Sequence, residues 1–231
     1  MTFLRSALFM VWFLILTLVM AIIFLPLLAA PRKATVRMAR RWARATLWGL
    51  RVFAGIGERR IGKVPQGGVL VASKHMSMWD TLALYLALDD PGIVLKRELL
   101  RIPFYGWYLG KAAAIPIDRS AGADALRRMT YAAQQVLADG RPILIFPEGT
   151  RKKPGAPPDY KPGVAGLYGM LGVACVPAAL DSGRYWQGFT KHPGTISLEF
   201  LEPIPPGLKR REFMTVLEQR IEDATNRMLR A

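Results

Sequence analysis

The chain has 231 residues and a formal net charge of +15, with 32 lysines and arginines against 17 aspartates and glutamates. This length is enough for one sizeable core, or for one domain with an appendage. The positive excess indicates an anionic partner: nucleic acid, an acidic membrane surface or a phosphate-bearing substrate. The single cysteine, Cys175, excludes an intramolecular disulfide and indicates a reducing compartment; because it lies in an apolar run, we interpret it as a buried structural thiol.

The N-terminal segment over residues 7–30 contains no charged residue. As a helix it would extend about 36 Å, and the hydrocarbon core of a bilayer is about 30 Å thick. A signal peptide is the competing interpretation, but the run is longer than a usual signal-peptide core, and Pro31 follows the small residues where cleavage would occur. Pro26 also allows a kinked helix that enters one leaflet without crossing. We therefore expect a hydrophobic membrane anchor over residues 1–31, either spanning the bilayer or lying in one leaflet.

The segment after this anchor is strongly basic, and residues 32–60 are expected to contain a basic amphipathic helix that suits anionic lipid. The arginines near one stripe of this helix are Arg37, Arg41, Arg44 and Arg51. The alternative is a solvated face on an ordinary helix. Only Arg5 precedes the uncharged run of residues 7–30, so the positive-inside rule places the rest of the chain on the cytoplasmic face, as at a bacterial inner membrane. Because the charge clusters beside the anchor and no nucleic-acid-binding signature is present, we expect no nucleic-acid partner.

Residues 61–231 alternate short apolar runs with helical patterns. The expected strands are 68–73, 92–96, 113–118, 141–146, 173–180 and 195–200. The expected helices are 80–88, 105–111, 123–138, 163–171 and 209–229. This alternation predicts an α/β fold, with a largely parallel or mixed sheet and helices on both faces.

The ends of these strands are where ligands of such sheets bind. The first strand is followed by KHMSMWD, which places His75 five residues before Asp80. If the chain bends between them, Asp80 can accept a hydrogen bond from one ring nitrogen and leave the other free as a base. The alternative is that Asp80 is an ordinary residue of a helix start, with Ser77 as the N-cap.

Two further polar clusters follow other strands. KRE at residues 96–98 adds positive charge after the second strand, and FPEGTR at residues 146–151 follows the fourth. Gly149 permits a tight turn, and Arg151 can bind a phosphate through its planar fork. Glu148 can accept from a substrate hydroxyl or hold the arginine in place. The alternative for each cluster is a surface ion pair.

Four segments, within roughly residues 66–205, resemble in order the four blocks shared by the glycerolipid acyltransferases. They are HMSMWD, KRELLRIPFYGWYLGKAAAIPIDR, FPEGTR and VACVP. Two residues depart from the family pattern: Lys74 stands where asparagine is common, and Met76 where glutamine is frequent. These departures leave the headgroup of the acceptor open.

The resemblance implies acyl transfer from a thioester to the free sn-2 hydroxyl of lysophosphatidate, giving phosphatidate in phospholipid synthesis. His75 would be the general base and Asp80 its orienting carboxylate. The residues implied in substrate binding are Lys96, Arg97, Glu148, Gly149, Thr150 and Arg151. The co-substrate would be acyl-CoA or an acyl carrier protein thioester, and neither a cofactor nor a metal is expected.

Two alternatives stay open at this point. One is an acyltransferase for another acceptor: a lyso-ornithine-type lipid, another lysophospholipid or glycerol 3-phosphate. The other is a non-catalytic membrane lipid-binding protein, which predicts loss of the His, Asp, Glu or Arg of these blocks, although all are present. Tyr105, Trp107 and Tyr108 either line a route to the membrane or pack in the core.

Overall fold

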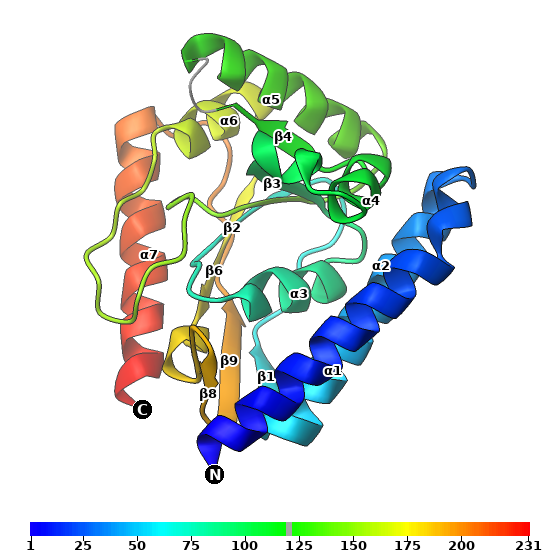
Figure 1. Ribbon diagram of the computed structural model, residues 1–231. Helices are drawn as coiled ribbons and strands as arrows, with labels where there is room; N and C mark the ends of the chain where they lie inside the picture. The colour runs from blue at the N-terminus through cyan, green and yellow to red at the C-terminus, as the bar shows by residue number, and fades with distance from the viewer. Residues whose placement is uncertain (119–121) are drawn as a thin grey trace.

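A mixed sheet of seven strands, in the order β1-β9-β6-β2-β5-β3-β4, forms the centre of the computed structural model, which describes residues 1–118 and 122–231 (Figure 1). The strands are β1 Ile56–Ile61, β2 Leu70–Ser73, β3 Gly92–Lys96, β4 Ile115–Ile117, β5 Ile143–Ile145, β6 Cys175–Leu180 and β9 Gly194–Phe200. Strands β2 to β6 are parallel to one another, and β9 pairs antiparallel with β6 and parallel with β1. The expected α/β fold is confirmed.

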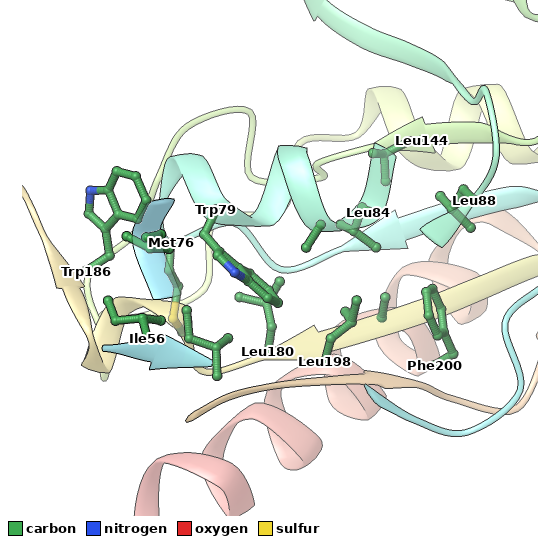
Figure 2. Packing of buried hydrophobic residues seen from close by; sticks show 14 of the residues in the cluster. Ile56, Met76, Trp79, Leu84, Leu88, Leu144, Leu180, Trp186, Leu198 and Phe200 are labelled. Atoms are coloured by element: carbon green, nitrogen blue, oxygen red, sulfur yellow. The ribbon is translucent and has the colours of Figure 1, made fainter. Parts of the chain in front are cut away.

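Helices cover both faces of this sheet. They are α3 Met78–Ala87, α4 Tyr105–Lys111, α5 Gly122–Ala138, α6 Gly163–Leu171 and α7 Arg210–Arg230, with a 3-10 turn η3 at Arg97–Arg101. Within β2, Val71 packs in the cluster beneath α3, whereas Leu70 and Ala72 pack against α5, α6 and α7. Figure 2 shows the first cluster, in which Trp79 of α3 lies against the sheet. Side-chain alternation thus produces two cores, one on each face.

Two regions differ from the expectation. β1 begins at Ile56, before the boundary expected at residue 61, and completes one edge of the sheet by pairing with β9. Only its first residue is buried, so it has no apolar alternation by which sequence reasoning could find it. The hairpin of β7 (Trp186–Gln187) and β8 (Thr190–Lys191) is likewise too short for a periodic signal. Arg119, in the second family block, lies outside the described residues.

The N-terminal segment forms two helices that run side by side. They are α1 Thr2–Ile23 and α2 Arg32–Gly49, joined by the 3-10 turn η1 Leu25–Leu28, and α2 continues into the π-helical turn η2 Leu50–Ala54. The indole nitrogen of Trp12 donates to Ala45 O at 3.1 Å. Gly49 permits this approach, because a Cβ there would lie 2.2 Å from the Trp12 ring.

Helix α1 packs along α2 and η2, and it contacts the rest of the domain near both of its ends (Figure 1). Near its start, Ser6 Oγ accepts from the backbone N–H of Lys191 at 2.9 Å, and near its end the Tyr108 hydroxyl donates to Ala21 O at 3.0 Å. Among the described helices, α1 alone is long and apolar enough to cross a membrane. Its outward residues are exposed and apolar, and include Leu4, Leu8, Val11, Leu14, Ile15, Leu18 and Ile22. This exposed apolar face indicates membrane association.

Candidate active site

Three parallel strands that are neighbours in the sheet, β2, β5 and β3, bring the expected polar segments to one edge. KHMSMWD follows β2, FPEGTR follows β5, and KRE begins at the last residue of β3. Because parallel strands end at the same edge of a sheet, segments that are distant in sequence meet there.

Asp80 lies in the first turn of α3 and accepts five hydrogen bonds. Its Oδ2 atom accepts from the backbone N–H groups of Met76 and Ser77, at 2.6 and 2.8 Å, and from His75 Nδ1 at 3.0 Å. Its Oδ1 atom accepts from Ser77 Oγ at 3.1 Å and from Ser182 Oγ. The carboxylate is fully buried, so these donors replace water around its charge.

Both interpretations of Asp80 therefore hold at once. Ser77 is the N-cap of α3 and forms a capping box with Asp80, which fixes the helix start. The same carboxylate receives His75 Nδ1. Because a carboxylate only accepts, Nδ1 carries the proton and Nε2 keeps a free lone pair that can act as a base.

His75 is held by two further contacts, one to its ring and one to its backbone. The ring stacks on Phe146 with ring centroids 4.0 Å apart, and the backbone carbonyl of His75 accepts from the backbone N–H of Lys152 at 2.8 Å. The His75 side chain is 13% exposed, so part of it stays accessible. The base is thus fixed in orientation yet open to a substrate hydroxyl.

Glu148 does not hold Arg151, in contrast to one of the two roles expected for it. Its carboxylate is buried and accepts from Lys74 Nζ at 2.8 Å, with a weaker contact of 3.5 Å from the backbone N–H of His75. Burial raises the pKa of Glu148, and the Lys74 ammonium opposes that rise. The buried lysine explains the difference: it is a closer and better shielded partner than an exposed guanidinium.

Three residues of the site have no counterpart in the sequence prediction. Glu222 of α7 accepts from Lys74 Nζ at 2.7 Å, and the Tyr160 hydroxyl donates to the same Glu222 oxygen at 2.9 Å. Ser182 follows β6 and donates to Asp80. Inspection of the end of β6 would have found Ser182, whereas nothing in the sequence links Lys74 to a glutamate 148 positions away.

The expected anion-binding residues divide into paired and unpaired groups. Lys96 Nζ lies 3.4 Å from Glu98 Oε1, and Arg97 Nη1 lies 3.2 Å from Asp118 Oδ2. Both basic side chains are more than half exposed. Arg151 is exposed, and none of the described carboxylates lies within ion-pair distance of it.

The turn that carries Arg151 follows β5. Gly149 adopts a φ of 64°, which a residue with a Cβ rarely adopts, and its N–H donates to Phe146 O at 2.9 Å. Thr150 is exposed beside it. This tight turn directs Glu148 into the protein while Arg151 faces solvent.

A cavity of about 490 Å³ lies between α7 and the loop that follows FPEGTR. Lys74 and Met76, the two neighbours of His75, are among its lining residues, together with Glu218, Glu222 and Thr225. His75 itself does not line it, so this cavity lies on the other side of the KHMSMWD segment from the base.

Two other kinds of site, a metal centre and a reactive thiol, were also considered from the sequence. Over residues 1–118 and 122–231, no group of three or more His, Cys, Asp or Glu side chains is arranged to hold a metal ion, and the expectation of a metal-free site stays a prediction. Cys175 is buried at the first residue of β6, and burial raises the pKa of its thiol. The interpretation of Cys175 as a buried thiol is confirmed.

The acyltransferase family model matches residues 57–181, which include the His75–Asp80 pair, the FPEGTR turn and β6. This chain belongs to the acyltransferase family. A 1-acyl-sn-glycerol-3-phosphate acyltransferase of Pseudomonas aeruginosa is 37% identical over 173 residues, which cover 73% of this chain and 67% of that protein. The alpha enzyme of the same name from Mus musculus is 31% identical over 147 residues, covering 61% of this chain and 51% of that protein.

A solved structure supports the fold of this family member. The crystal structure of PlsC, the 1-acyl-sn-glycerophosphate acyltransferase of Thermotoga maritima, matches with a TM-score of 0.79 and covers 99% of this chain and 98% of that one. The two sequences are 19% identical, so this match establishes the shared fold alone.

Proposed function

We propose that this chain is a membrane-bound O-acyltransferase that transfers an acyl group from a thioester to the sn-2 hydroxyl of lysophosphatidate and so forms phosphatidate. The proposal is carried by one observation: the fixed His75 base and Arg151, which has no carboxylate partner among the described residues, lie at the same edge of the sheet. The names of the Pseudomonas and mouse relatives support this acceptor.

The chemistry follows from the geometry of His75. Its Nε2 atom takes the proton of the acceptor hydroxyl as that oxygen attacks the thioester carbonyl, and the buried Asp80 carboxylate stabilises the resulting imidazolium. The tetrahedral intermediate collapses with cleavage of the carbon–sulfur bond, and the imidazolium returns its proton to the leaving thiolate. No covalent acyl-enzyme is needed. Arg151 binds the phosphate of the acceptor, with Lys96 and Arg97 adding positive charge nearby.

The membrane arrangement is part of the proposal. Helix α1 contacts the domain near both of its ends. We therefore place α1 within one leaflet, with its exposed apolar face toward the lipid, and not across the bilayer. Arg37, Arg41 and Arg44 are exposed on the adjacent α2 and would contact anionic headgroups. We place the catalytic domain on the cytoplasmic face of a bacterial inner membrane, where acyl-CoA and acyl carrier protein thioesters are present.

The test is acyl transfer from labelled thioester to lysophosphatidate by wild type and by His75→Ala, in liposomes. Acyl-CoA and acyl carrier protein donors are assayed separately, and glycerol 3-phosphate and a lyso-ornithine lipid serve as competing acceptors. Turnover of lysophosphatidate by wild type, with a loss of about 10²–10⁴ in the variant, is expected. Activity that survives His75→Ala would overturn the mechanism, and turnover only with another acceptor would overturn the substrate.

A further inference from the structure

The Lys74 ammonium is the point where three segments of the site meet. It is 2% exposed and donates to Glu148 Oε1 at 2.8 Å and to Glu222 Oε1 at 2.7 Å. Glu148 belongs to the FPEGTR turn and Glu222 to α7, while Lys74 itself directly precedes His75. The hydroxyl of Tyr160 completes the network by donating to Glu222 Oε1 at 2.9 Å.

The cation that pairs with Glu148 is Lys74 and not Arg151. Glu148 and Arg151 are three positions apart in one turn, and a charged carboxylate beside a guanidinium is a strong pair. Yet Glu148 is buried against Lys74, whereas Arg151 is exposed and lacks a carboxylate partner in the described part of the chain. A buried carboxylate is stable only with a compensating donor, so removing Lys74 would drive Glu148 either to bind a proton or to find another cation.

We infer that Lys74 is a positioning residue: by holding Glu148 in the protein interior, it keeps Arg151 free to bind the phosphate of the acceptor. The inference deepens the proposed function and rests on it for the identity of the phosphate. The ammonium does not need to touch either substrate. Its effect passes through Glu148, and this pathway distinguishes it from a residue that only stabilises the fold.

The kinetic test is a double-mutant cycle of wild type, Lys74→Met, Glu148→Gln and the double variant, with KM measured separately for lysophosphatidate and for the thioester donor. Lys74→Met is expected to raise KM for lysophosphatidate about tenfold or more, because Glu148 then competes for Arg151, and to leave KM for the donor within about twofold. In the Glu148→Gln background the neutral amide does not compete, so removing Lys74 should have no further effect on KM. An equal rise in both backgrounds would overturn the inference.

The double variant keeps the test decisive even if Lys74→Met does not fold. Lys74→Met leaves two carboxylates without their cation, the buried Glu148 and the partly exposed Glu222. In the double variant Glu148 is also neutral, and Glu222 keeps the Tyr160 hydroxyl as a donor, which is better tolerated. If Lys74→Met does not fold, Glu148→Gln and the double variant are compared directly, and a difference of more than about threefold in acceptor KM refutes the inference. Lys161→Met is the matched control: it removes a lysine that pairs with Asp159 on the neighbouring loop, and should leave KM unchanged.

The pH dependence gives a second readout that a purely structural role would not move. Glu148 faces the Lys74 ammonium, the Glu222 carboxylate and the backbone N–H of His75. Burial and Glu222 raise the pKa of Glu148 while Lys74 lowers it, so in Lys74→Met this pKa rises further. As the pH falls, Glu148 in that variant becomes neutral and releases Arg151. The ratio of the KM for lysophosphatidate in Lys74→Met to that in wild type should therefore decrease as the pH is lowered. A ratio that does not change with pH would contradict the inference.

Labelling of Arg151 separates the inference from the proposed function. Phenylglyoxal modifies guanidinium groups, and peptide mass spectrometry follows Arg151 alone, without any substrate. Arg151 should react several-fold more slowly in Lys74→Met than in wild type, and at the wild-type rate in the double variant. Equal rates in all three proteins would refute the role of Lys74 even if lysophosphatidate is the substrate. Conversely, a wild type that does not acylate lysophosphatidate overturns the proposed function while the labelling still tests Lys74.

Discussion

His75 Nδ1 lies 3.0 Å from the Oδ2 atom of Asp80, which is also the carboxylate that caps the first turn of α3. One buried group thus fixes both the start of a helix and the tautomer of a base. Because the same oxygen accepts from the backbone N–H groups of Met76 and Ser77, the chain between His75 and Asp80 is folded into a single rigid turn. This turn is what brings together two side chains that are five positions apart in the sequence.

Asp80→Asn should therefore reduce kcat by about 10²–10⁴, since an amide at this position can donate to Nδ1 and hold the ring in the wrong tautomer. KM values for both substrates should change little, because Asp80 is fully buried and does not contact them. Steady-state kinetics with lysophosphatidate checks this expectation.

The control for Asp80→Asn is Ser77→Ala, which removes the N-cap hydroxyl but keeps the contact between His75 and Asp80. It should lower the free energy of unfolding by about 1 kcal/mol, with a much smaller effect on kcat. If both variants lost kcat equally, the Asp80 effect would be one of helix stability and not of the base.

Arg151→Ala should raise KM for lysophosphatidate by about 10–100-fold through loss of a charge-assisted contact to phosphate. With a neutral acceptor such as a monoacylglycerol, wild type and variant should differ by less than about threefold. Arg127→Ala is a suitable control, because Arg127 is an exposed arginine of α5 that lies outside the four family segments. A loss that is equal for charged and neutral acceptors would show that Arg151 does not bind phosphate.

Cys175 should resist alkylation in the native protein, because it is fully buried and burial raises the pKa of its thiol. N-ethylmaleimide at neutral pH should leave turnover unchanged, and Cys175→Ala should retain activity. The measurement is residual activity after treatment, with labelling of Cys175 followed by mass spectrometry. Inactivation of wild type but not of Cys175→Ala would instead assign the thiol a role.

Much of the fold was predictable because its signals are local. The buried parallel strands are continuous apolar runs, and β3 has the bounds expected from the sequence. Because ligands of such sheets bind at the ends of the strands, His75 and the FPEGTR turn could be predicted to lie at one edge of the sheet. β1 escaped prediction because it is an edge strand with five residues that are not buried, held by its pairing with β9 and not by an apolar pattern.

The part of the site that could not be predicted depends on contacts between segments far apart in the chain. Lys74 appeared as a departure from a family pattern, and only the packing of α7 reveals that its ammonium pairs with Glu222. Similarly, the role of Glu148 depended on whether its side chain turned inward or outward. Sequence shows which charges are present near a site but not which of them neutralise one another.

Membrane binding should depend on the exposed arginines of α2. Replacing Arg37, Arg41 and Arg44 by glutamine removes three charges, each worth about 1 kcal/mol at an anionic surface, so binding to vesicles rich in anionic lipid should weaken about 100-fold. Binding to zwitterionic vesicles should change far less, because the apolar face of α1 is intact. Vesicle co-sedimentation at two salt concentrations provides the measurement.

The matched control for α2 is a triple variant of exposed arginines on α7, namely Arg210, Arg211 and Arg220, also changed to glutamine. It removes the same charge from a helix on the opposite face of the sheet from α3 (Figure 1). If both triple variants weakened binding equally, net charge alone, and not the position of α2, would account for the attraction.

Lys191 should make the stability of the protein depend on pH near the contact between α1 and the β7–β8 hairpin. Its Nζ atom is buried, donates to the carbonyls of Gly188 and Phe189, and lies 4.7 Å from the centre of the Trp186 ring. Burial lowers the pKa of Lys191 to about 8. Between this value and its ordinary pKa of 10.5, the unfolded chain binds more protons than the native protein. The free energy of unfolding should therefore rise as the pH increases from 8 toward 9.5, and the full destabilisation by the buried charge is present below pH 8.

The measurement for Lys191 is the melting temperature between about pH 7 and 9.5, below the range in which tyrosines ionise. The rise with pH should be several degrees larger in wild type than in Lys191→Met, because methionine has no proton to lose at this contact. Lys209→Met, at an exposed lysine before α7, should keep the wild-type dependence. If wild type and Lys191→Met showed parallel curves, Lys191 would titrate at its ordinary pKa, and the carbonyl and ring contacts would then fully compensate its burial.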